Sequence, residues 1–148
     1  MSLLPEERRR DKSLDAIQKA GAAIVQDGKV LVVRNKTQTS PEYFMAGGKM
    51  EGDETQRETL VRELMEELGV DIKLMEYLGS YNDIDMLGAG PIVIHAYYVE
   101  IDEAKNIEPR GEIKEYAWVD KDFEEKGIPL GSIMARKVIP ELVRRSLM

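Results

Sequence analysis

The chain contains no cysteine and only one histidine, His95. Disulfides, thiolate metal sites and cysteine nucleophiles are therefore excluded. A zinc site is disfavoured, because zinc is usually held by cysteine and histidine. The sequence also lacks a run of 18 apolar residues and an apolar secretory signal near its start, MSLLPEERRRDK. We therefore expect a cytoplasmic protein that does not act at a membrane.

Carboxylates are abundant instead. Asp and Glu number 28 against 21 Lys and Arg, which gives a formal charge of −7. A field of this sign repels a polyanion, so a long nucleic acid is not expected as a partner. A small phosphate compound that arrives with its own metal ion remains compatible with this charge.

The length and composition fit one domain. The chain has 148 residues, of which 43% are hydrophobic, and this is enough for a single packed core. Residues 1–13 are highly charged and show no periodicity, so we interpret them as a charged N-terminal arm. Residues 14–148 are then the folded domain.

The pattern of elements predicts an α/β sandwich with a mixed β-sheet, because strands occur before, between and after helices. Two β-rich runs flank Asp27-Gly28, which is a strong hairpin signal. A helix over residues 132–147 is predicted to kink or divide at Pro140. Strands are predicted over residues 18–26, 29–34, 43–45, 72–81, 91–101 and 113–119.

A second helix is predicted over residues 54–68. Asp53 is the expected N-cap, and Gly69 is a natural C-terminal stop. The apolar side chains of this segment recur at helical spacing and are expected to pack on a sheet. They are Leu60, Val61, Leu64 and Leu68.

The acids of this helix carry the functional signal. Glu63, Glu66 and Glu67 stand at i, i+3 and i+4, so the three carboxylates share one helix face. Each unpaired like-charge pair costs roughly 0.2–0.5 kcal/mol on an exposed helix, so helix stability does not explain the cluster. A bound Mg²⁺ ion would explain the cluster, because Mg²⁺ prefers oxygen ligands and usually keeps waters and substrate phosphate oxygens in its shell. The segment therefore predicts phosphoryl chemistry.

Two neighbouring features support this prediction. The pair Gly47-Gly48 is interpreted as a turn that lets the backbone approach a ligand. Arg62 lies next to Glu63 and can hold a carboxylate with two hydrogen bonds.

Residues 47–70 resemble the signature of the Nudix hydrolase family, in its MutT-like form. The pattern asks for Gly, five residues, Glu, seven residues, Arg-Glu, an aliphatic residue, any residue, Glu-Glu, any residue, Gly and an aliphatic residue. Seven fixed identities coincide by chance with a probability on the order of 10⁻⁸ per starting point. The matching positions, here called the Nudix box, are Gly48, Glu54, Arg62, Glu63, Leu64, Glu66, Glu67, Gly69 and Val70.

The resemblance implies an α/β/α sandwich and hydrolysis of a nucleoside diphosphate derivative with Mg²⁺ or Mn²⁺. By position, Glu66 and Glu67 would be the main metal ligands, assisted by Glu63 and the carbonyl of Gly47 or Gly48. Arg62 would orient the glutamates, and Glu54 would support the helix and its loop. The chain departs from common relatives at Ala46, where proline often precedes the glycines.

The general base is left open between Glu63 and a glutamate outside the box. Similar proteins often use such an outside residue as base or extra ligand. Glu112 and Glu115 precede Trp118 in a stretch that resembles that region, and Glu112 is favoured as catalytic residue and metal ligand. We also consider Glu115, Phe44 and Tyr81 as substrate contacts, although aromatic residues in short strands more often belong to the core. A strand histidine with satisfied hydrogen bonds is the favoured interpretation of His95.

The expected substrate is a small nucleotide, with a nucleoside triphosphate, ordinary or modified, as the best candidate. The products would be the monophosphate and pyrophosphate. ADP-ribose, a nucleotide sugar or a dinucleoside polyphosphate are alternative substrates, and a non-catalytic nucleotide sensor is the alternative from another class. Dimers are frequent among similar proteins, so a homodimer is also considered.

Overall fold

The computed structural model describes residues 16–84, 90–104 and 106–148. The predicted arm over residues 1–13 lies outside the described residues. Within the described ranges, no helix is long and apolar enough to cross a membrane.

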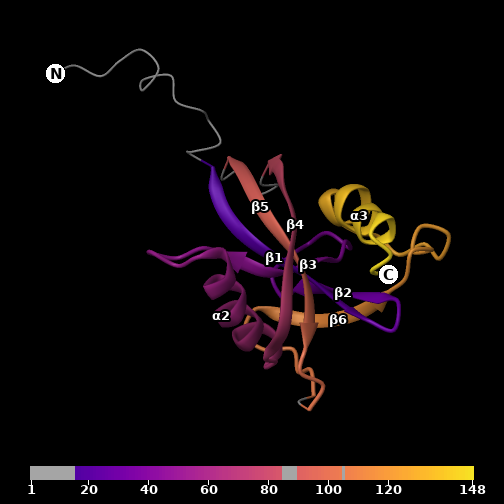
Figure 1. Ribbon diagram of the computed structural model, residues 1–148. Coiled ribbons are helices and arrows are strands. Elements are labelled where there is room, and N and C mark those ends of the chain that lie inside the picture. The colour runs from indigo at the N-terminus through magenta and orange to yellow at the C-terminus, as the bar shows by residue number, and fades with distance from the viewer. Residues whose placement is uncertain (1–15, 85–89, 105) are drawn as a thin grey trace.

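A six-stranded sheet forms the middle of the molecule, with the order β4-β5-β1-β3-β2-β6 (Figure 1). β1 runs parallel to β5, and the other pairings are antiparallel, which confirms the prediction of a mixed sheet. The strands are β1 (Ile17–Gln26), β2 (Lys29–Asn35), β3 (Phe44–Lys49), β4 (Ile72–Ile84), β5 (Pro91–Ile101) and β6 (Ile113–Val119).

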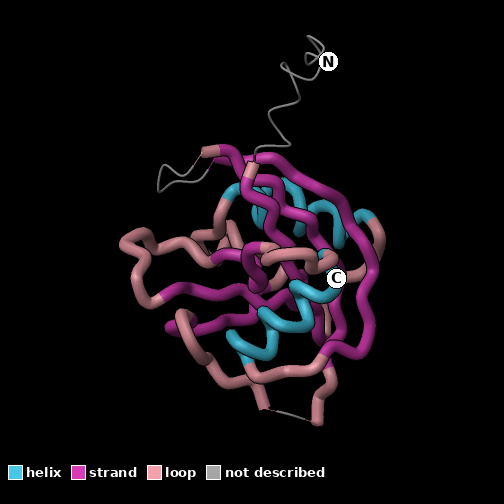
Figure 2. The backbone as a smooth tube through the Cα atoms, turned by 90° about the vertical axis from the view of Figure 1, so that its left-hand side faces the viewer, coloured by secondary structure: helices cyan, strands magenta, loops and turns pink. Residues whose placement is uncertain are grey.

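Helices cover both faces of this sheet (Figures 1 and 2). On one face α2 (Gln56–Leu68) packs Leu60, Leu64 and Leu68 into a buried cluster with β1, β2 and β5. On the other face lie η2 (Met134–Val138), a π-helical turn, and α3 (Ile139–Arg144). The predicted α/β sandwich is confirmed. Val61 does not join the buried stripe as expected, because its side chain is 54% exposed.

The β1–β2 hairpin forms where the sequence predicts it. Val25 pairs with Val30 and Gln26 with Lys29, so Asp27 and Gly28 are the two turn residues. Both have positive φ angles, 51° and 75°, as a type I′ turn requires.

The glycine pair lies in a strand, so the prediction of a turn at this point is wrong. β3 runs on to Lys49, past the predicted end at residue 45, because Ala46, Gly47 and Gly48 pair with β1. Gly47 has a φ of 131°, and a Cβ atom there would overlap the carbonyl oxygen of Ala20. Close contact between two strands therefore requires the glycine.

The other boundaries differ less. β4 continues to Ile84, three residues beyond the predicted end, because Asn82 and Asp83 still pair with β5. The C-terminal helix divides between Val138 and Ile139, one residue before Pro140, as expected, and α3 ends at Arg144. Proline has no N–H to donate, and upstream the Ile139 N–H reaches back to Met134, five residues away.

Candidate active site

α2 begins with a capping box at Thr55, not at Asp53 as predicted. The Thr55 side chain accepts from the Glu58 N–H at 3.1 Å, and the Glu58 carboxylate accepts from the Thr55 N–H at 3.0 Å. Thr55 and Glu58 are three residues apart, so the sequence carried this signal in the letters TQRE. This cap fixes where the helix begins, and the packing of its apolar face on the sheet sets which side the box acids face.

Arg62 donates hydrogen bonds to several groups of the site. Its guanidinium donates to both carboxylate oxygens of Glu54, at 2.7 and 2.9 Å, and to Glu63 at 2.8 Å. It also reaches Glu66 at 3.3 Å and the carbonyl oxygen of Lys49 at 3.1 Å. One arginine thus joins the end of β3, the following loop and the acidic face of α2, which is consistent with an orienting role.

Glu54 closes the loop between β3 and α2. Its carboxylate accepts from the Glu51 N–H at 2.9 Å and from the hydroxyl of Thr59, which is fully buried, at 3.1 Å. The hydrogen bonds from Arg62 are the main reason why its pKa falls to about 2. Glu54 is therefore a charged support that Arg62 holds in place.

Glu67 is the most perturbed acid of the box. Its Oε1 accepts from the Gly47 N–H at 3.0 Å, which places the carboxylate beside the bend in β3. Burial raises its pKa to about 8, against the opposing effect of the Gly47 hydrogen bond, and the charges of Glu63, Glu112 and Glu66 raise it further. A bound cation would relieve this excess of negative charge.

Glu63 lies against Gly48. A Cβ atom on Gly48 would come within 2.5 Å of the Glu63 carboxyl carbon, so only glycine leaves room for this side chain. Burial raises the pKa of Glu63, while Arg62 acts in the opposite direction. The two glycines therefore act on different acids. The Gly47 N–H donates a hydrogen bond to Glu67, and the missing side chain of Gly48 leaves room for the Glu63 carboxylate.

The structure distinguishes the two glutamates outside the box. The charge of Glu112 contributes to the raised pKa of Glu67, so Glu112 lies near enough to act on this acid of the box. Glu115 is engaged elsewhere, because Arg34 and the Tyr43 hydroxyl, at 2.9 Å, both donate to it. A β-bulge at Arg34/Asn35 shifts the register of β6 between the two glutamates.

The contacts of the remaining candidates are with other parts of the molecule. Phe44 is 39% exposed and packs against Gly131. Tyr81 packs against the core under α3, and burial raises its pKa. The His95 ring accepts from Ser80 at 2.6 Å and donates to Gln18 at 2.7 Å, as expected for a structural strand histidine.

The donor set fits a hard divalent cation. The charges of Glu63, Glu66 and Glu112 all raise the pKa of Glu67, whose carboxylate accepts from the Gly47 N–H. In the described part of the chain, no group of three or more acidic or histidine side chains is arranged so that it could hold a metal ion by itself. Mg²⁺ usually takes only one or two protein carboxylates and fills its shell with water and phosphate oxygens, so a partial set of ligands suffices.

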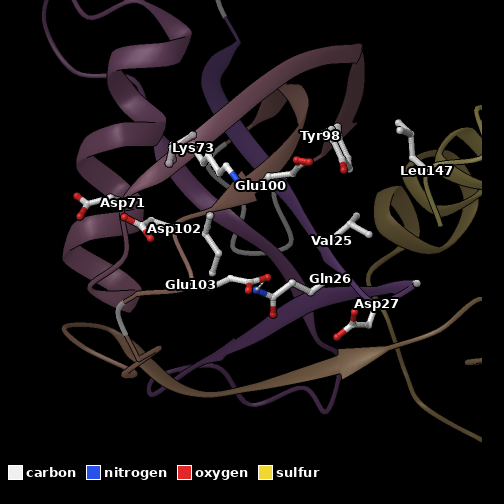
Figure 3. Close-up of a pocket in the computed structure, with 13 residues that line it drawn as sticks. Val25, Gln26, Asp27, Asp71, Lys73, Tyr98, Glu100, Asp102, Glu103 and Leu147 are labelled. Carbon is white, nitrogen blue, oxygen red and sulfur yellow. Dashed lines mark hydrogen bonds between the residues drawn. The ribbon is translucent and has the colours of Figure 1, made fainter.

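A separate cavity of about 700 Å³ lies near the β1–β2 hairpin and the start of β4 (Figure 3). Among the described residues that line it, the charged ones are mostly acidic and include Asp71, Asp102 and Glu103, whereas Lys73 is basic. It contains none of the box residues.

Comparison with known proteins places the chain in a family. The model of the NUDIX domain matches residues 17–136. The CTP pyrophosphohydrolase of Escherichia coli (strain K12) is 39% identical over 85 residues, which are 56% of this chain and 62% of that relative. The chain belongs to the Nudix family, as the box predicted.

Solved structures agree with this assignment. The solution structure of the E. coli ORF135 protein has a TM-score of 0.66 and 32% identity, and the match covers 89% of each chain. The NUDIX domain of Shewanella oneidensis NrtR, solved with ADP-ribose, has a TM-score of 0.70 and covers 100% of both chains. Its identity is 18%, so this likeness shows the fold alone.

Proposed function

We propose that this chain is a pyrophosphohydrolase that uses Mg²⁺ or Mn²⁺ to cleave a small nucleoside triphosphate into the monophosphate and pyrophosphate. The observation that carries the proposal is the arrangement of the box acids at β3, where Arg62 holds Glu63 and Glu66 and the Gly47 N–H holds the buried carboxylate of Glu67. The similarity to a CTP pyrophosphohydrolase supports a triphosphate and makes CTP and related pyrimidine nucleotides the first substrates to test.

The residues divide the work as follows. Glu66 and Glu67 are the main metal ligands, with Glu63, Glu112 and the carbonyl of Gly47 in support. A cation held by these residues would supply positive charge for the diphosphate oxygens and would make a nearby water more acidic. Arg62 orients Glu63 and Glu66, and its own position is fixed by Glu54.

In the reaction, the oxygen of a water molecule forms a bond to phosphorus of the anhydride and the bridging P–O bond breaks. A carboxylate accepts the proton of the water. Glu63 is one candidate, because burial raises its pKa and so makes it a better proton acceptor than an ordinary glutamate. Glu112 is the other candidate base, since its charge reaches the same acids.

The wider expectations are part of the same proposal. The partner is a small nucleotide, not a long nucleic acid, and the protein acts in the cytoplasm. Phe44, Tyr81 and Glu115 remain predicted substrate contacts. A homodimer also remains a prediction, which light scattering of the purified protein would test.

A substrate panel tests the function. Nucleoside triphosphates including CTP, ADP-ribose, nucleotide sugars and dinucleoside polyphosphates are incubated with Mg²⁺ or Mn²⁺, and the products are separated by ion-exchange chromatography. We expect monophosphate and pyrophosphate from a triphosphate, and a loss of at least about 100-fold in Glu67→Gln. Wild-type turnover by Glu67→Gln would refute the metal assignment. No turnover of any compound would favour a nucleotide sensor.

A further inference from the structure

The segment 108–112, between β5 and β6, contacts the C-terminal end of α2. The Glu108 N–H donates to the carbonyl oxygen of Leu68 at 3.0 Å, and the Arg110 N–H donates to that of Glu67 at 2.8 Å. These carbonyls belong to the last turn of the helix, where the backbone has no partner within the helix itself. The segment therefore binds the turn that carries the most perturbed acid of the box.

The side chain of Arg110 makes a second contact with the same helix end. Gly69 ends α2 with a φ of 66°, and a Cβ atom there would lie 2.6 Å from the guanidinium carbon of Arg110. The guanidinium thus lies flat against a position where only glycine leaves room. Its positive charge also faces the negative end of the helix dipole.

Glu112 follows two residues later. Gly111, at a φ of 55°, turns the chain, and the Ile113 N–H closes this turn on the Arg110 carbonyl at 2.9 Å. On the far side, the Lys36 N–H donates to the Glu112 carbonyl at 2.8 Å. The main chain of Glu112 is therefore held between the end of α2 and the end of β2.

We propose that residues 108–112 form a clamp on the last turn of α2 that sets the position of the Glu112 carboxylate relative to Glu67, with Arg110 as its positioning residue. The inference rests on the proposed function, because it concerns how a metal ligand outside the box is brought to the box. In this proposal Arg110 acts through Glu112, because its own contacts with α2 are with the backbone at the end of that helix. The clamp explains how a glutamate 45 positions after Glu67 in the sequence comes to act on it.

The test measures binding of Mn²⁺ alone to the full chain, by electron paramagnetic resonance and without nucleotide. Arg110→Ala removes the guanidinium from Gly69, and Gly111→Ala strains the turn at its positive φ. Each is expected to weaken Mn²⁺ affinity about tenfold, the lower end for residues that orient metal ligands. Arg136→Ala, which removes the same charge from an exposed position of η2, is the matched control and is expected to leave the affinity unchanged. Thermal melts without metal confirm that each variant is folded.

A double-mutant cycle separates positioning from general loosening. Glu112→Gln removes the proposed ligand, and if Arg110 acts through it, the double variant with Arg110→Ala binds Mn²⁺ no more weakly than Glu112→Gln alone. Losses that add in full would overturn the clamp, as would unchanged affinity in both Arg110→Ala and Gly111→Ala. Glu67→Gln distinguishes a failure of the proposed function from a failure of the clamp. If Glu67→Gln leaves the Mn²⁺ affinity unchanged, the proposed function fails. If Glu67→Gln and Glu112→Gln both lose Mn²⁺ affinity but Arg110→Ala and Gly111→Ala do not, only the clamp is refuted.

Discussion

Replacing Glu67 by glutamine is expected to stabilise the metal-free protein while abolishing its activity. Burial and three neighbouring acids raise the pKa of Glu67 to about 8 from an ordinary value of 4.5. A rise of this size corresponds to a penalty of about 5 kcal/mol for the charged form at high pH. Glutamine removes the charge and can still accept the Gly47 N–H, so the variant avoids the penalty and keeps the hydrogen bond.

The sign of the pH dependence follows from linkage. The folded protein holds a proton on Glu67 up to about pH 8, whereas the unfolded chain releases it near pH 4.5. The contribution of Glu67 to stability is therefore complete below pH 4.5 and is lost as the pH rises through 8. The advantage of Glu67→Gln should be close to zero at pH 4, grow across this window and level off above pH 8. Because water still reaches the side chain in part, we expect a plateau of about 2–5 kcal/mol.

Urea unfolding in EDTA between pH 4 and pH 9 measures this difference. At 148 residues the expected plateau corresponds to a rise in Tm of roughly 5–15 °C. Glu124→Gln, which removes one charge from an exposed position, is the matched control and should change little. A difference between Glu67→Gln and wild type that stays flat from pH 4 to pH 9, or a destabilised variant at pH 9, would show that Glu67 is not held in a charge-disfavouring environment.

Three further substitutions test other parts of the site. Thr55→Ala removes the cap of α2 and should lower the free energy of unfolding by about 1 kcal/mol, measured in urea, while a change below 0.3 kcal/mol would argue against the cap. Gly47→Ala should prevent folding or leave a strongly destabilised protein by circular dichroism, because its Cβ would overlap the Ala20 carbonyl, and a variant with native stability would contradict this close contact. Arg62→Gln should return the pKa of Glu54 from about 2 towards its ordinary value. The wild type gains stability from this depressed pKa above pH 4.5 and loses this stability as the pH falls towards 2. The Tm advantage of the wild type over Arg62→Gln should therefore shrink as the pH falls. A constant Tm advantage would exclude the ion pair as its source.

The local features of this protein could be predicted from its sequence. Helical periodicity places Glu63, Glu66 and Glu67 on one face of α2, and the Asp27-Gly28 pair specifies a tight hairpin, since both depend on residues close together in the chain. The mixed sheet and the family followed from the order of elements and the spacing of the box. The N-cap was predicted wrongly at Asp53, although the letters of the capping box at Thr55 were present.

Contacts between distant segments decided the rest. β3 extends through Gly47 and Gly48 because β1 pairs with them. The residues around the two glycines do not indicate which strand they pair with. The separation of Glu112 from Glu115 comes from a bulge between β2 and β6 and from the contacts of Arg110 with the end of α2. Acidic spacing alone singled out the residues that we propose as metal ligands. Burial in the folded chain set the pKa of Glu67, because desolvation exists only once the surrounding elements have packed.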